Sequence, residues 1–139
     1  MIIVDTSGLL AALFSDQRRH REAASVLLEM DGPFVLSPFV LAELDYLITK
    51  LAGVEVELAM LDEVARGAYR LAEFGPGEVA LAREVIKKYP GLDLGLADAS
   101  LVVLAESSGV RDLLTLDARH FRTVLGPRGE PFRILPADL

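Results

Sequence analysis

Four acidic residues lie where a predicted strand ends or where a predicted helix faces the core. Asp5 follows an apolar run, and Asp117 follows a strand predicted just before it. Glu43 and Asp98 lie within helical patterns, among apolar residues that share their helix faces. Ligands of parallel sheets bind beyond the carboxyl ends of the strands, so these four side chains can meet above one edge of a sheet.

Carboxylates gathered in this way would repel one another and raise each other's pKa values. A hard divalent cation with oxygen ligands removes that penalty, and Mg²⁺ and Mn²⁺ suit carboxylates and water. One ion can orient and deprotonate a water while another stabilises a leaving oxygen, which fits hydrolysis of a phosphodiester. His20 and His120 are too few and too poorly spaced for a zinc site, and we expect both to be surface groups.

Each carboxylate also has a purely structural interpretation. Asp5, Asp98 and Asp117 can be N-caps of the helices that follow them. Glu43 can reach solvent from the rim of its apolar stripe, since no Lys or Arg lies three or four residues away to pair with it. The residue types and their spacing leave both interpretations open.

Polar neighbours of these residues could support a metal site from outside the ligand set. Thr6, Ser7 and Thr115 could hydrogen-bond the carboxylates or metal-bound waters. Thr6 and Ser7 could also cap the first helix in place of Asp5, and local turn bonding is the favoured interpretation for Ser7. Asp45 is expected to be solvated, and Asp93 is expected to cap a helix or face solvent.

Alternating strand and helix patterns predict an α/β fold with a mostly parallel sheet covered on both sides. Strands are predicted over residues 1–4, 34–36, 69–74, 112–116 and 132–135, and helices over residues 9–14, 20–30, 37–52, 55–66, 78–88, 96–106 and 118–124. No repeat or linker divides the chain, so residues 1–139 are expected to form a single domain.

The overall charge argues against a nucleic-acid ligand, because phosphate contacts need Lys and Arg and the net charge is −7. The objection weakens if several carboxylates belong to a metal site. Small basic groups at residues 18–21, 87–88 and 119–122 are more typical of solvated helix faces. Cysteine is absent, which excludes disulfides, and no uncharged stretch is long enough to span a bilayer, so we expect a cytoplasmic protein without membrane contact.

Four short segments resemble motifs of the PIN-domain family. They are Ile-Ile-Val-Asp5-Thr6-Ser7, Glu43 within Leu-Ala-Glu-Leu, Leu-Ala-Asp98-Ala-Ser, and Leu-Thr115-Leu-Asp117-Ala-Arg-His-Phe121. The motifs occur in the expected order and the match extends over essentially the whole chain. The likeness is strongest to the VapC-type toxins of bacterial and archaeal toxin–antitoxin pairs.

The resemblance implies a three-layer α/β/α PIN-like domain with a central, mostly parallel sheet, acting as an Mg²⁺- or Mn²⁺-dependent endoribonuclease on RNA. Asp5, Glu43, Asp98 and Asp117 would be the catalytic, metal-binding carboxylates, supported by Thr6 and Thr115. The resemblance further implies a homodimer and an antitoxin protein that blocks the site.

Some family members carry another acidic residue just after the last motif aspartate. Here that neighbourhood is Ala118-Arg119-His120, so a second metal would be held loosely or arrive with substrate. Arg119 is a candidate for steering RNA toward the site.

Three other classes of protein are alternatives. A receiver domain is also small, acidic, α/β and Mg²⁺-binding, but it needs paired acids after its first strand, and this chain has none there. A haloacid-dehalogenase-like phosphatase needs a second aspartate where this chain has Ser7. A catalytically inactive domain that binds a partner protein is compatible with the sequence, although the four retained carboxylates argue against it.

Overall fold

A five-stranded, entirely parallel sheet forms the centre of the molecule in the computed structural model, which describes residues 1–139. Its strands are β1 (Ile2–Val4), β2 (Phe34–Leu36), β3 (Arg70–Leu71), β4 (Asp112–Leu114) and β5 (Arg133–Leu135), in the order β3-β2-β1-β4-β5. Strand β1 lies between β2 and β4 and is fully buried, which is why its sequence is continuously apolar rather than alternating.

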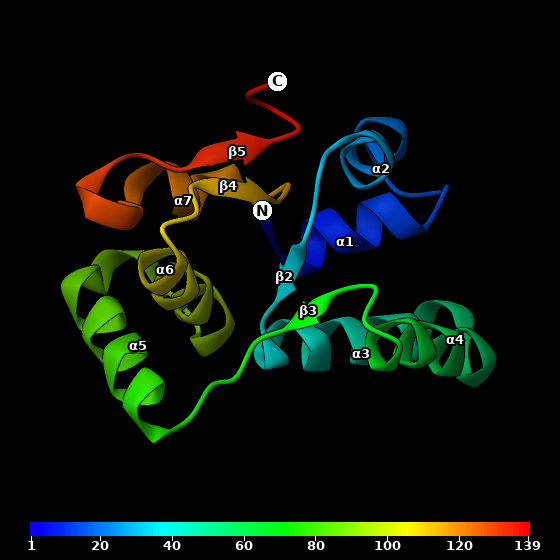
Figure 1. The fold of residues 1–139 in the computed structure, drawn as a ribbon, viewed down its shortest axis with the longest axis horizontal. Coiled ribbons are helices and arrows are strands. Elements are labelled where there is room, and N and C mark those ends of the chain that lie inside the picture. Colours follow the sequence, from blue (N-terminus) through cyan, green and yellow to red (C-terminus); the bar gives the residue numbers. More distant parts are fainter.

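Helices cover both faces of this sheet (Figure 1). They are α1 (Thr6–Leu13), α2 (His20–Glu29), α3 (Pro38–Ala52), α4 (Val54–Ala65), α5 (Pro76–Lys88), α6 (Leu96–Ser108) and α7 (Ala118–Thr123). The chain moves outward in one direction from β1 to β3, then returns across β1 to β4 and β5. Because parallel crossovers are right-handed, the first four helices lie on one face and the last three on the other. The three-layer α/β/α prediction is confirmed.

Local sequence signals explain where the long helix α3 begins and ends. The Ser37 side chain accepts a hydrogen bond from the backbone N–H of Phe39 (3.2 Å), and Pro38 occupies the first turn. Gly53 ends the helix with a φ of 88°, a conformation that residues with a Cβ avoid. These are the boundaries that the sequence predicts, and they fix how far Glu43 lies along the helix.

Two elements differ from their predictions by three residues at one end, and the other boundaries agree more closely. Helix α1 begins at Thr6 rather than residue 9, because Asp5 caps it and draws Thr6 and Ser7 into its first turn. The strand predicted over residues 69–74 contains only Arg70 and Leu71, at the outer edge of the sheet, where both side chains are exposed. A strand with one neighbour and no buried side chain has little to extend it.

Helix α1 lies directly against β4, and a glycine permits this approach. A Cβ built on Gly8 would be 2.4 Å from the carbonyl oxygen of Leu114, far inside van der Waals contact. Any other residue at this position would therefore push the start of α1 away from the end of β4. None of the helices is both long and apolar enough to span a membrane.

Candidate active site

The candidate site lies at the carboxyl edge of the sheet, where β1 and β4 end side by side. Val4 pairs with Leu114, and the next backbone N–H, that of Asp5, donates to the Leu114 carbonyl oxygen (2.9 Å). The backbone N–H of Thr115 is held in turn by Leu135 of β5 (3.0 Å). The sheet's own hydrogen bonds therefore place Asp5 and Thr115 next to each other.

Asp5 is the buried centre of the site, with 5% of its surface exposed. Its Oδ1 accepts a hydrogen bond from the Thr6 backbone N–H (2.8 Å), and its Oδ2 accepts one from the Thr115 hydroxyl (2.8 Å). Burial, with smaller contributions from the negative charges of Asp98 and Glu43, raises the pKa of Asp5 from 3.8 to about 6. Asp5 is thus the N-cap of α1 and also a member of the carboxylate cluster, so its two interpretations do not exclude each other.

Glu43 reaches the site from α3 and is exposed to solvent. The Thr6 hydroxyl donates to Glu43 Oε1 (2.8 Å), which joins α3 to the first turn of α1. Thr6 thus contacts both carboxylates: its N–H binds Asp5 and its hydroxyl binds Glu43. This is the supporting position that the sequence predicts for Thr6.

Asp98 lies in the first turn of α6 and is not an N-cap, since Gly95 holds that position. Its carboxylate accepts a hydrogen bond from Nδ1 of His120 (2.9 Å). Partial burial raises its pKa above the ordinary value, His120 lowers it, and the charge of Asp117 raises it further. Asp93 does not begin this helix either: it is exposed, in a left-handed conformation, after a short 3₁₀ turn.

Asp117 follows β4 at the start of α7, where its side chain is 47% exposed and makes no capping hydrogen bond. Asp117 therefore occupies the N-cap position of α7, as one interpretation predicts, but its side chain does not cap the helix. The backbone N–H of Asp117 donates to the Thr115 hydroxyl oxygen (3.0 Å). The Thr115 side chain, which donates to Asp5, therefore also fixes the backbone of Asp117.

Two expectations about neighbouring histidines are wrong. His120 is buried rather than on the surface, and its Nδ1 lies 2.9 Å from Asp98 and 3.7 Å from Asp117. His20 is half-buried, and its Nδ1 bonds to the carbonyl oxygen of Ala11 (2.7 Å). The spacing of His120 and Asp117, three residues apart in a helix, is the one sequence signal for this contact. The approach of His120 to Asp98 depends on tertiary packing and leaves no local signal.

Ser7 and Asp45 also differ from expectation. Ser7 makes distant bonds as well as a local one: its Oγ donates to Oδ2 of Asp5 (3.4 Å), accepts from the Leu116 backbone N–H (3.0 Å) and lies 3.1 Å from the Thr115 hydroxyl. Asp45 is not solvated, because α4 folds back against α3 and leaves its Oδ1 buried without a hydrogen-bond partner. Its carboxylate also raises the pKa of Glu57 on α4 through a shared hydrogen bond.

The four carboxylates form one series of neighbouring charges, in which Asp5 interacts with Glu43 and Asp98, and Asp98 interacts with Asp117. Their oxygen atoms, supported by hydroxyl groups, are the donors that Mg²⁺ and Mn²⁺ prefer, and a cation would offset the cost of ionising Asp5. No three His, Asp or Glu side chains converge closely enough in this structure to form a metal site by themselves. Asp98 is instead engaged by His120, and Glu43 by Thr6. The residues fit a hard cation by donor type and charge rather than by a preformed arrangement of ligands.

Two hollows of the surface differ in character. A cavity of about 350 Å³ lies beside the carboxylates and shares Ser7 and Leu116 with their surroundings. A larger one, about 440 Å³, lies among α5, α6 and the turn at Pro127–Gly129, and it is lined by residues such as Val85, Val103 and Leu125. None of the four carboxylates lines either hollow, but only the smaller one includes residues that adjoin them.

Comparison with known proteins gives a consistent family match. Residues 2–125 match the family model described as PIN domain. Ribonuclease VapC26 of Mycobacterium tuberculosis is 40% identical over 135 residues, which cover 97% of this chain and all of that protein.

Solved structures share the fold at low sequence identity. Mycobacterium tuberculosis VapC20, described as a sarcin–ricin loop cleaving toxin, superposes with a TM-score of 0.79 at 19% identity, covering 86% of this chain and 92% of that one. VapBC2 from Rickettsia felis, solved with a DNA fragment from its promoter, gives a TM-score of 0.68 at 19% identity over 96% of this chain and 98% of the other.

Proposed function

The chain belongs to the PIN domain family, and from this premise we propose that it is a metal-dependent endoribonuclease acting as the toxin of a toxin–antitoxin pair. The observation that carries the proposal is the buried carboxylate of Asp5, held at the junction of β1 and β4 with the charges of Glu43 and Asp98 beside it. The sequence identity of 40% to a ribonuclease, over 97% of this chain, supports the same activity.

Asp5, Glu43, Asp98 and Asp117 are the residues that would hold Mg²⁺ or Mn²⁺. The bound ion would supply Lewis acidity, lowering the pKa of a water and stabilising negative charge on the leaving oxygen. The sequence between β4 and α7 offers no further carboxylate close to Asp117, which favours one firmly held ion.

The chain's own residues keep these carboxylates in place. Thr115 and the Thr6 N–H hold the two oxygens of Asp5, so its carboxylate has one orientation. The Thr6 hydroxyl holds Oε1 of Glu43, and His120 holds Oδ2 of Asp98. Fixing ligand orientation in this way lowers the reorganisation that binding and reaction would otherwise require.

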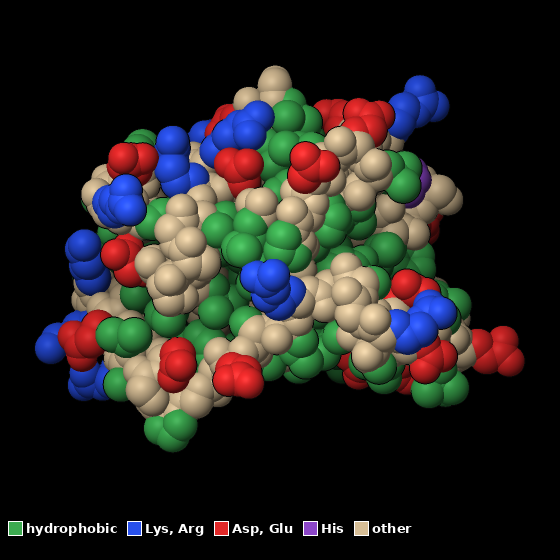
Figure 2. Space-filling view, viewed as in Figure 1, with side chains coloured by type: hydrophobic (Ala, Val, Ile, Leu, Met, Phe, Trp, Pro, Cys, Tyr) green, Lys and Arg blue, Asp and Glu red, His purple; other side chains and the backbone are tan.

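The substrate is RNA and the protein partner is an antitoxin in this proposal, which the VapBC complexes among similar folds support. A homodimer is proposed on the family resemblance. The net charge of −7 means that RNA is not attracted by the molecule as a whole. Figure 2 shows acidic and basic side chains interspersed over one face with apolar ones between them, rather than a continuous basic surface. Local cations such as Arg119 must therefore assist binding at the site.

The direct test is cleavage of a panel of structured and unstructured RNAs by the purified protein with Mg²⁺, with Mn²⁺ and with EDTA. We expect cleavage that requires metal and is lost in Asp98→Asn while that variant keeps the wild-type circular dichroism spectrum. A folded Asp98→Asn variant with full activity would contradict the assignment of the site. A folded wild type that cleaves no RNA with either metal would contradict the function and favour a protein-binding domain.

A further inference from the structure

The cavity of about 350 Å³ beside the carboxylates shares two of its walls with the candidate active site. It is lined by Ser7, Leu10, Gln17, Arg18, Arg19 and Leu116. Ser7 bonds to the Leu116 backbone N–H (3.0 Å) and lies 3.1 Å from Thr115, which holds Asp5. Leu116 directly precedes Asp117 in the chain. A ligand in this cavity would therefore contact two residues that adjoin Asp5 and Asp117, although no carboxylate lines the cavity itself.

The cavity's charged wall is the turn between α1 and α2, and only one of its two arginines is paired. Arg19 donates to Glu22 Oε2 from both its Nε (3.1 Å) and its Nη2 (2.7 Å). Arg18 makes no ion pair, and its side chain is exposed at the cavity. Arg18 is therefore the positive charge left for a ligand.

This turn is held in a defined shape. Arg19 adopts a left-handed conformation with a φ of 57°, at the N-cap of α2. The next residue, His20, donates from Nδ1 to the carbonyl oxygen of Ala11 on α1 (2.7 Å). Because contacts with both helices fix the backbone of the turn, the position of Arg18 beside the cavity is set before a ligand binds.

The remaining lining matches the parts of a nucleotide. Leu10 and Leu116 are apolar and can contact the face of a base, while the Gln17 amide can donate to and accept from its edge. The volume falls within the range of small-molecule sites, which begins at about 300 Å³. The Arg18 guanidinium suits a phosphate, for which its planar donors are well arranged.

We propose that this cavity is a nucleotide subsite, which holds one unpaired nucleotide of the RNA next to the cleaved phosphodiester, with Arg18 on its phosphate and Gln17 on its base. The inference rests on the proposed ribonuclease function and adds a requirement to it. A base must leave its stack to enter the cavity, so the RNA must be single-stranded at that nucleotide. The subsite also explains how an acidic protein can bring a polyanion to its carboxylates, since the compensating charge lies beside them.

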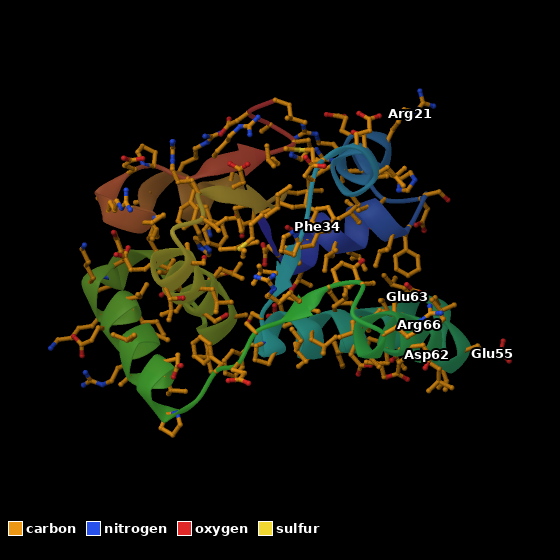
Figure 3. All side chains as sticks on the ribbon, viewed as in Figure 1. Arg21, Phe34, Glu55, Asp62, Glu63 and Arg66 are labelled. Carbon is orange, nitrogen blue, oxygen red and sulfur yellow. The ribbon has the colours of Figure 1, made fainter.

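Kinetics with matched variants test the role of Arg18. Arg21 is the control: it lies three residues further on, carries the same charge, and points away from the molecule on α2 (Figure 3). With an RNA that the wild type cleaves, we expect Arg18→Ala to raise KM about tenfold, the effect of losing one charge-assisted contact, with kcat nearly unchanged. Arg21→Ala should leave both constants close to wild type. Equal effects of the two variants would reveal a general charge effect and overturn the subsite.

An abasic scan tests whether a base occupies the cavity. Single abasic sites are placed within two nucleotides of the cut, and each RNA is assayed with wild type and with Gln17→Ala. We expect one abasic position to raise KM for the wild type but to have no added effect in Gln17→Ala, because the contact is already lost. Additive effects at every position would overturn the assignment.

Binding without cleavage separates this inference from the proposed function. Titration with the four ribonucleoside 5′-monophosphates, followed by amide NMR shifts, should perturb Ser7, Gln17 and Leu116 in the wild type and not in Arg18→Ala. A protein that cleaves RNA but shows no shift at these amides with any of the four would overturn the subsite alone. Shifts at these amides in a protein that cleaves no RNA would support the nucleotide site and contradict the nuclease.

Discussion

The site has two halves, one carried by the sheet and one by the helices. Asp5 and Thr115 follow β1 and β4, are 5% and 1% exposed, and bind each other. Glu43 and Asp98 come from α3 and α6, and each is held by one side-chain hydrogen bond, from Thr6 and His120 respectively. The Glu43 residue is exposed and the Asp98 side chain is 22% exposed.

The difference follows from how each half is attached. Residues directly after paired strands have their backbones set by the ladder itself, as the bond from Asp5 N–H to the Leu114 carbonyl oxygen shows. A glutamate on a helix reaches the same point through several rotatable bonds, whose ordering costs entropy. The sheet half is thus arranged in advance, whereas the helix half can adjust to a metal or to substrate.

The largest expected effect comes from neutralising the centre of the sheet half. Asp5→Asn should lower the cleavage rate by at least about a thousandfold, since an ion held by fewer charges loses several kcal/mol of transition-state stabilisation. Single-turnover rates at saturating Mn²⁺ measure this, with Asp93→Asn as the exposed control. If Glu43→Gln were more damaging than Asp5→Asn, the ranking of the two halves would be reversed.

Removing the hydroxyl of Thr115 should have the next largest effect. Thr115→Val keeps the shape but removes the donor to Asp5 and the acceptor for the Asp117 N–H. We expect a loss of activity of about 10- to 100-fold. The free energy of unfolding should fall by about 1–3 kcal/mol, measured by urea denaturation. Thr123→Val, which removes an exposed hydroxyl on α7, should change neither quantity measurably.

The raised pKa of Asp5 predicts how stability depends on pH without added metal. Between 3.8 and about 6 the folded protein binds more protons at Asp5 than the unfolded chain, so the free energy of unfolding falls as pH rises through this window. The fall amounts to about 3 kcal/mol. Urea denaturation in EDTA at pH 4 to 7 should show it, and Asp5→Asn should be more stable than wild type at pH 7 but not at pH 4. Parallel profiles for the two proteins would contradict the burial argument.

The smallest effect is expected from removing the hydrogen bond between the Thr6 hydroxyl and Glu43, in the helix half of the site. Thr6→Val releases Glu43 Oε1 but leaves the backbone contact between Thr6 and Asp5 intact. Activity should fall by less than about tenfold, since one hydrogen bond to an exposed carboxylate can re-form with water. The same single-turnover assay measures it. A loss larger than that of Thr115→Val would mean that the helix half is as fixed as the sheet half.

The sheet half could be predicted from sequence because its signals are local. An apolar run followed by Asp5, and another followed by Thr115 and Asp117, are enough to place these residues at one edge of a parallel sheet. Most helix boundaries were also predictable, since Pro38, Gly53 and their neighbours carry capping and stop signals.

What could not be predicted depends on contacts between distant segments. The burial of His120 against Asp98 requires α6 and α7 to pack on the same face, which no pattern within either helix specifies. The burial of Asp45 likewise requires α4 to fold back on α3. The bond from the Leu116 N–H to Ser7 likewise joins residues 109 positions apart, so the sequence indicates only the local bond of Ser7 to Asp5.

The order of the strands has a consequence for the synthesis of the protein. Asp5 and Glu43 are translated early, but the hydrogen bond that fixes Asp5 joins residues 110 positions apart, and β4 is the fourth of five strands to be made. A chain still on the ribosome can form α1 to α4 while the middle of its sheet lacks a neighbour. The site therefore assembles only after β4 has been made, and a chain interrupted before β4 would be released as an inert fragment rather than a partly active enzyme.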